Sequence, residues 1–132
     1  MYVPFTELLS IEDRAHTIGE LSELFGITLR TIRFYEERGL LAPRRAAART
    51  RIYDRDDVAR LSLIVTCRRY GLAVHEIADL LALRDRRGTA AFNPALVAAL
   101  EQRRSAIGEE IAEAEALRSE LGGWIDEIAR AG

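Results

Sequence analysis

Apolar residues recur at helical spacing early in the chain, in two short runs separated by a glycine turn. The first run, at residues 18–25, follows Thr17, which can cap a helix and form a capping box with Glu20. Gly26 supplies the residue with positive φ that ends this helix. A second helix then begins after Thr28 as its cap. Two short helices joined by a glycine turn predict a helix-turn-helix.

The second of these helices carries different chemistry on its two sides. Arg30 and Arg33 lie three residues apart, with Thr31 beside them. Ile32 and Tyr35 fall on another face, where they can be buried against the preceding helix. A helix that presents arginines in this way can read the major groove of DNA. A surface helix with solvated arginines has the same pattern and stays as the alternative.

A basic segment follows. After Pro43 breaks the helix, four arginines stand on what reads as a loop between two short extended pieces, at Arg44, Arg45, Arg49 and Arg51. Guanidinium groups on such a hairpin can bind phosphate oxygens without reading base sequence. We interpret the segment as a wing beside the recognition helix, with an alanine-rich solvated loop as the alternative.

The next segments predict two supporting helices. Asp54 can cap a helix that runs to about Tyr70, and Gly71 ends it. Residues 72–83 form a second amphipathic helix that we expect to pack across the first. Residues 84–91 read as an exposed connection.

A long helix is predicted from about residue 94, with Asn93 as cap and Pro94 at its first position. Its apolar residues follow the alternating four-and-three step of a heptad seam. A lone helix of this length cannot bury such a stripe, so a partner chain is implied. The expected dimerisation residues are Leu100, Ile107, Ile111, Ala114, Leu121, Ile125 and Ile128.

Two features modify this seam. Arg104 and Arg118 interrupt it and can select an antiparallel register by pairing with acids of the other chain, for instance Glu110 or Glu113. Gly122 and Gly123 predict a bend at which Trp124, Ile125 and Ile128 fold back. Core packing is the expected role of Trp124, with stacking on a ligand as the alternative.

Charge is segregated along the chain. The 132 residues suffice for one DNA-binding domain and an extended helix, and 48% of them are hydrophobic, so a disordered tail is excluded. The net charge of −2 hides eleven arginines against five acids between Thr28 and Arg69. From Glu101 onward the acids outnumber the arginines by eight to four. Association with DNA depends on the local basic patch and not on the total.

Chemistry beyond DNA contact is nearly absent from the sequence. Cys67 is the only cysteine and fits a packing role, with oxidation between two subunits as the alternative. His16 and His75 show no metal spacing and suit solvated or helix-end roles. No phosphate loop or catalytic triad layout is present, so we expect no enzyme, no cofactor and no metal. The first 15 residues are too short and acidic for a signal peptide, and no apolar run reaches transmembrane length, which predicts a cytoplasmic protein.

Several motifs along the chain belong together. They comprise Thr17-Ile18-Gly19-Glu20-Leu21, Arg30-Thr31-Ile32-Arg33-Phe34-Tyr35-Glu36, Gly39-Leu40-Leu41, Arg51-Ile52-Tyr53, Asp57-Val58-Ala59-Arg60-Leu61, Tyr70-Gly71-Leu72, Glu76-Ile77 and Leu80-Leu81-Ala82-Leu83. Together these motifs resemble the DNA-binding domain of the MerR family of bacterial transcription regulators. The resemblance covers about residues 16–84. It implies a mainly α fold, in which a winged helix-turn-helix precedes a long dimerisation helix that forms an antiparallel coiled coil. The implied division is an N-terminal extension (1–15), the DNA-binding domain (16–84), a linker (85–93) and the dimerisation helix (94–132).

The resemblance also implies a function. Family members bind palindromic promoter DNA as homodimers, and activators distort the promoter spacer so that RNA polymerase can engage both promoter elements. We expect no separate effector domain after the dimerisation helix, and a small-molecule effector stays unknown. An architectural DNA-bending protein of the excisionase type and a helical protein-binding adaptor are the alternatives.

Two departures from the family pattern concern the wing and a helix start. Arg49 and Thr50 stand where the family commonly has a glycine and an aromatic residue. Ala73 replaces a serine or threonine cap, which weakens that helix start by about 1 kcal/mol. With the resemblance included, the predicted DNA-binding residues are Thr28, Arg30, Thr31, Arg33, Phe34, Tyr35, Arg44, Arg45, Arg49, Arg51 and Tyr53.

Overall fold

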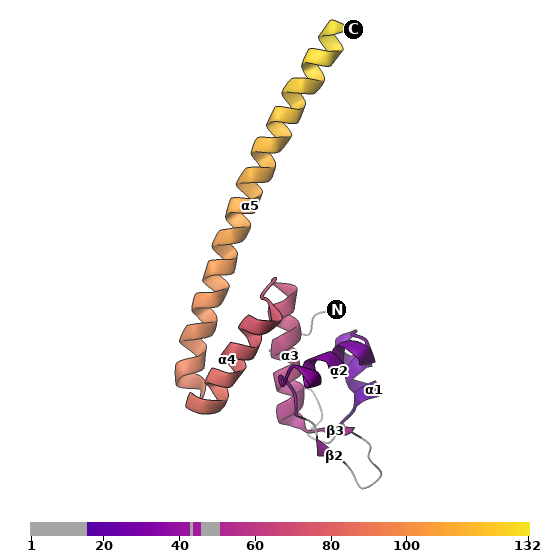
Figure 1. Cartoon of the computed structure of the whole chain (residues 1–132), viewed down its shortest axis with the longest axis vertical. Helices are drawn as coiled ribbons and strands as arrows, with labels where there is room; N and C mark the ends of the chain where they lie inside the picture. The colour runs from indigo at the N-terminus through magenta and orange to yellow at the C-terminus, as the bar shows by residue number, and fades with distance from the viewer. Residues whose placement is uncertain (1–15, 43, 46–50) are drawn as a thin grey trace. The chain divides into compact units, whose positions relative to one another are not determined.

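The computed structural model describes residues 16–42, 44–45 and 51–132 (Figure 1). Among these residues the elements follow one another in the order β1 (His16–Thr17), α1 (Ile18–Phe25), α2 (Leu29–Glu37), β2 (Arg44–Arg45), β3 (Arg51–Tyr53), α3 (Arg55–Arg69), α4 (Val74–Arg87) and α5 (Thr89–Ala131). The chain divides into a first unit, residues 1–96, and a second unit, residues 97–132. The predicted mainly α fold with a helix-turn-helix, a wing and a long C-terminal helix is confirmed.

The helix-turn-helix is built by local capping. The Glu20 N–H donates to Thr17 Oγ1 at 3.2 Å, and the Thr17 N–H donates to the Glu20 carboxylate, which completes the expected capping box. Gly26 has a φ of 65°, so α1 ends in the left-handed conformation that glycine adopts without strain. The sequence signals for this motif are therefore confirmed.

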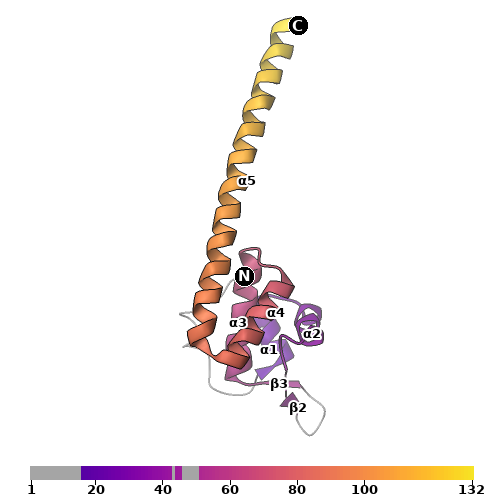
Figure 2. The same cartoon turned by 60° about the vertical axis from the view of Figure 1, so that its left-hand side comes forward.

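A small antiparallel sheet stands next to the helix-turn-helix, in the strand order β1-β3-β2. The central strand β3 pairs Ile52 with Arg44 of β2 and Tyr53 with His16 of β1. Both views show β2 beside β3 (Figures 1 and 2). The two extended pieces of the predicted wing are confirmed, whereas the two-residue strand β1 was not predicted from the sequence.

The supporting helices α3 and α4 begin at caps of unequal quality. Asp54 and Asp57 exchange backbone-to-carboxylate hydrogen bonds of 2.9 and 3.1 Å at the start of α3. Ala73 offers no side-chain acceptor, and only its N–H is satisfied, by the Glu76 carboxylate at 3.0 Å. Half of a capping box is thus retained at α4, in agreement with the weaker start that the alanine predicted.

The hydrophobic core of the first unit lies among the sheet and the helices. Its largest fully buried side chains come from helices, from strand β3 and from the segments between them. They include Leu21, Phe25, Ile32, Leu40, Tyr53, Leu61, Ile64, Leu72, Ile77 and Leu81. Burial of these side chains supplies most of the driving force for folding. Helix α1 contacts α2, α3 and β3, so the place of α2 in the fold depends on its packing against α1.

The long helix α5 differs from the prediction at its start and at the glycine pair Gly122 and Gly123. It begins at Thr89, so Asn93 is not its cap and Pro94 lies inside it. The Phe92 N–H donates to the Gly88 carbonyl at 3.1 Å and the Phe92 side chain is buried, which favours the extra turn over the cost of one missing proline N–H. Gly122 and Gly123 lie within the same uninterrupted helix, so the predicted bend is wrong. Throughout the described part of the chain, no helix combines the length and apolar character needed to cross a membrane.

Candidate nucleic-acid interface

The start of α2 is fixed by two threonines. Thr28 Oγ1 accepts from the Thr31 N–H at 3.1 Å, and the two hydroxyl oxygens lie 2.8 Å apart. Both side chains are therefore engaged in the cap. The cap holds the first turn of α2, which contains Arg30.

The two-sided character predicted for α2 is confirmed. Arg30 and Arg33 are exposed, whereas Ile32 and Tyr35 are buried. Burial raises the pKa of the Tyr35 phenol, against a smaller opposing effect of the nearby Arg68 guanidinium. The buried pair fixes the rotation of the helix, so both arginines point into solvent.

Phe34 lies beside these arginines on the solvent side, with 37% of its surface exposed. The Arg38 guanidinium lies over its ring, 5.2 Å from the centroid. Such a cation–π contact restrains an exposed ring. Phe34 is thus available for contact with a sugar, and its predicted DNA contact stays a prediction.

Tyr53 requires a correction. Its side chain is fully buried, and its hydroxyl donates a hydrogen bond to the Glu36 carboxylate. A buried ring cannot touch DNA directly, and the same holds for the ring of Tyr35. The physical reason is that both rings belong to the hydrophobic core, where the Tyr53 hydroxyl is bound by Glu36 of α2. Tyr53 instead ties the wing strand to α2.

The wing arginines are placed by strand register. Arg44 and Arg45 form β2, and Arg45 pairs with Arg51 of β3. Arg49 lies outside the described residues. Three of the four predicted arginines thus come together on one antiparallel pair of strands, and their contact with phosphates stays a prediction.

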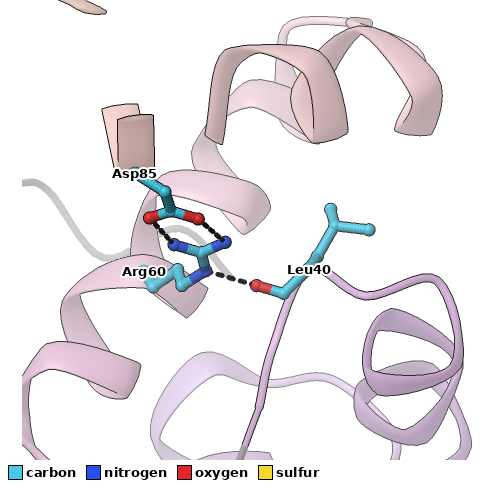
Figure 3. Close-up of polar contacts among 3 residues, drawn as sticks. All are labelled: Leu40, Arg60 and Asp85. Atoms are coloured by element: carbon cyan, nitrogen blue, oxygen red, sulfur yellow. Dashed lines mark hydrogen bonds and ion pairs between the residues drawn. The ribbon is translucent and has the colours of Figure 1, made fainter. Parts of the chain in front are cut away.

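A polar cluster formed by Arg60, Asp85 and the Leu40 carbonyl was not predicted from the sequence. Arg60 of α3 donates through Nη1 and Nη2 to the two carboxylate oxygens of Asp85, at 2.8 and 3.0 Å (Figure 3). Its Nε donates to the Leu40 carbonyl. The only signal in the sequence is an arginine beside the apolar stripe of α3, between Val58 and Leu61.

The predicted dimerisation residues lie on the solvent-exposed helix α5. Ile107, Ile111, Ala114, Leu121, Ile125 and Ile128 are exposed and Leu100 is half-buried. Val97, which sequence reasoning omitted, extends the seam by one step, and Leu117 and Trp124 flank it. Trp124 is 63% exposed in the single chain, so the expected core packing is wrong for the isolated subunit.

The remaining candidate residues occupy structural positions. Cys67 is buried, as the packing interpretation predicted. His16 is also buried, which corrects the expected solvated role, and His75 is exposed. Among the described residues no group of three or more histidine, cysteine, aspartate or glutamate side chains is arranged to hold a metal ion.

The chain is similar to known regulators over residues 16–124. The family description "MerR HTH family regulatory protein" matches residues 16–83, and "MerR, DNA binding" matches residues 58–124. The HTH-type transcriptional regulator CueR of Bacillus subtilis is 41% identical over 66 residues, which cover 50% of this chain and 46% of that protein. The chain spans about half the length of the curated relatives that it matches.

Solved structures share the fold. HiNmlR, a MerR family regulator lacking the sensor domain, bound to promoter DNA, gives a TM-score of 0.62 at 24% identity, over 77% of this chain and 76% of that one. PbrR691 from Ralstonia metallidurans CH34, in complex with lead(II), gives a TM-score of 0.58 at 34% identity, over 79% and 84% of the two chains. The first likeness concerns the fold alone.

Cys67 provides a test of the packing around α3. Burial raises the pKa of its thiol from 9.0 to about 11, because the buried site disfavours the thiolate. At pH 8 the thiolate fraction should be about a hundredfold lower than in the unfolded chain. We expect correspondingly slow labelling by a thiol reagent in buffer and fast labelling in denaturant. Equal rates in the two conditions would contradict the burial of Cys67.

Proposed function

Because the chain belongs to the MerR family of helix-turn-helix regulatory proteins, we propose that it is a homodimeric transcription regulator that binds a palindromic promoter site. In this proposal each subunit offers α2 to the major groove of one half-site, and the wing arginines contact the adjacent phosphates. The bound dimer distorts the promoter spacer and so controls access of RNA polymerase. Its partners are thus double-stranded promoter DNA, a second copy of the chain and, indirectly, RNA polymerase in the cytoplasm.

The observation that carries the DNA-binding part is the outward face of α2. Arg30 and Arg33 are exposed while Ile32 and Tyr35 anchor the helix. Arginine forks can bind guanine edges or phosphate oxygens, and the rigid anchor fixes where they point. We assign base-edge or adjacent phosphate contacts to Arg30, Thr31 and Arg33, and backbone contacts to Arg44, Arg45, Arg49 and Arg51.

The seam of α5 supports a dimer in place of the two alternatives. Most apolar seam residues between Val97 and Ile128 face solvent in the single chain, with Leu100 half-buried. An excisionase-type protein lacks such a helix, and a helical adaptor does not require an arginine-bearing helix-turn-helix. The proposed division therefore keeps residues 16–84 for DNA and residues 94–132 for dimerisation. The segment expected as a linker, residues 85–93, is not an extended connection, because it consists of the end of α4, Gly88 and the first residues of α5.

One antiparallel register uses every seam position. It sets Ile111 against the partner's Ala114, Val97 against the partner's Ile128, and Leu100 against the partner's Ile125. The two interrupting arginines then face apolar residues, since Arg104 meets the partner's Leu121 and Arg118 meets the partner's Ile107. Their charged ends must find partners on the flanks of the seam.

The flanks of this register offer such partners. Arg118 comes beside the partner's Glu110, whereas Glu113 lies away from the seam. Within the single chain Glu110 already accepts from Arg103 at 3.0 Å, so in the dimer it would stand between two arginines. Arg104 comes beside the partner's Trp124, whose exposed ring face can receive a guanidinium. This gives Trp124 a packing role that requires the second copy.

Removal of the Arg33 guanidinium tests the assignment of α2. Footprinting on the gene's own upstream region should show one protected palindrome between the two promoter elements. Arg33→Ala should weaken binding to that site by about 1–3 kcal/mol, because a bidentate contact is lost. Arg130→Ala, which makes the same charge change on the last turn of α5, is the control. Equal affinities for the Arg33 variant and the wild type would remove Arg33 from the interface.

The wing contact predicts a different signature. Arg51→Ala should weaken binding to all duplexes alike, with the slope of log affinity against log salt reduced by about 1, because one phosphate contact is lost. Titrations at several salt concentrations with the cognate site and with random duplex measure both effects. A loss confined to the cognate site would instead assign Arg51 to base reading.

Charge exchange tests the register of the dimer. Arg118→Glu and Glu110→Arg, made singly, should each weaken dimerisation by about tenfold or more, because each places like charges together. The double variant should restore the dimer in sedimentation equilibrium. Arg118→Glu combined with Glu113→Arg is the matched control and should not restore it. Rescue by the control instead would assign the pairing to Glu113 and refute this register.

A further inference from the structure

The end of α2 is held through both backbone polar groups of Leu40, its N–H and its carbonyl. The Leu40 N–H donates to the Tyr35 carbonyl at 2.9 Å, directly after Gly39, whose φ of 77° turns the chain. The Leu40 carbonyl accepts from Arg60 Nε, and the Leu40 side chain is buried. The end of α2 therefore cannot rotate without disturbing the Arg60 guanidinium.

The acidic partner of Arg60 lies where α4 turns into α5. Asp85 belongs to the last turn of α4, three residues before Gly88. At this turn the Gly88 N–H donates to the Arg84 carbonyl at 2.8 Å. The Arg84 guanidinium lies over the buried Phe92 ring, 5.7 Å from its centroid. Asp85 thus marks a well-packed turn that begins the long helix.

Arg60 joins these two places through a single planar group. Three of its nitrogens donate, one to Leu40 and two to Asp85, and the close-up shows the guanidinium between the two acceptors (Figure 3). The Arg60 side chain is 16% exposed and the Asp85 side chain 56%. An ion pair at this exposure adds little to stability, but a bidentate fork fixes relative orientation. The cluster therefore suits a geometric role.

We propose that Arg60 is a positioning residue that sets the orientation of α2 relative to the α4–α5 turn, and thereby the separation of the two recognition helices in the dimer. The inference rests on the proposed function, since this separation has meaning only for a dimer on two half-sites. Half-sites on B-DNA lie on one face of the duplex only at defined spacings. A change in the orientation of α2 should therefore alter the preferred spacing between half-sites without removing a contact between the protein and DNA.

The test varies the distance between half-sites. Affinities of the full chain are measured for duplexes whose two half-sites are separated by spacers that increase one base pair at a time. Asp85→Asn keeps the shape of the side chain but removes its charge and one acceptor oxygen. We expect the discrimination between the best spacer and its neighbours to fall about tenfold, while affinity for the best duplex changes by less than about threefold. Asp79→Asn, the same change at an exposed position of α4, should keep the wild-type preference.

A second variant separates geometry from charge. Arg60→Lys keeps the positive charge but cannot bind both carboxylate oxygens and the Leu40 carbonyl in one plane. It should lose the spacing preference like Asp85→Asn, and thermal unfolding of each variant checks its fold. Wild-type spacing preference in both variants, or an equal loss of affinity for every spacer, would overturn the positioning role. A wild-type chain with no preference for any duplex would refute the proposed function, a result distinct from either of these.

Discussion

The burial of Ile32 and Tyr35 is the contact on which the remainder of the structure depends. These two side chains fix the rotation of α2, and that rotation leaves Arg30 and Arg33 in solvent. A helix of nine residues has too few internal hydrogen bonds to be stable alone, so its orientation must come from packing. The candidate interface is thus a consequence of core formation on the opposite side of the same helix.

Polar contacts at the two ends of α2 further restrict the orientation that core packing gives this helix. At its start Thr28 caps the helix, and toward its end Glu36 accepts from the hydroxyl of Tyr53 in β3. Beyond the last turn, the Leu40 carbonyl meets Arg60. The wing, the recognition helix and the supporting helices are therefore joined by specific hydrogen bonds as well as by apolar packing. Such contacts restrict orientation more than they add to stability.

In the second unit most apolar side chains are exposed instead of buried. Apart from the half-buried Leu100, the apolar seam of α5 from Val97 onward remains exposed in the single chain, and so does Trp124. Apolar rows of this length at heptad spacing are typical of a helix that completes its packing with a second helix. The proposed register accounts for both arginines in the seam, which a purely apolar zipper would exclude. In the proposed dimer, folding of the first unit and association through the second are therefore driven by separate hydrophobic surfaces.

The sequence by itself determined the local elements, because capping residues, positive-φ glycines and the period of apolar residues act within one or two turns. Thr17, Gly26, Thr28 and Asp54 marked their helix boundaries correctly, and the arginine face of α2 followed from its period. The burial of Tyr53 and the meeting of Arg60 with Asp85 were decided only by tertiary structure. Those contacts join residues 17 to 25 positions apart, where no local period or cap carries information. The start of α5 was decided in the same way, because burial of Phe92 outweighed the local signal of Asn93 and Pro94.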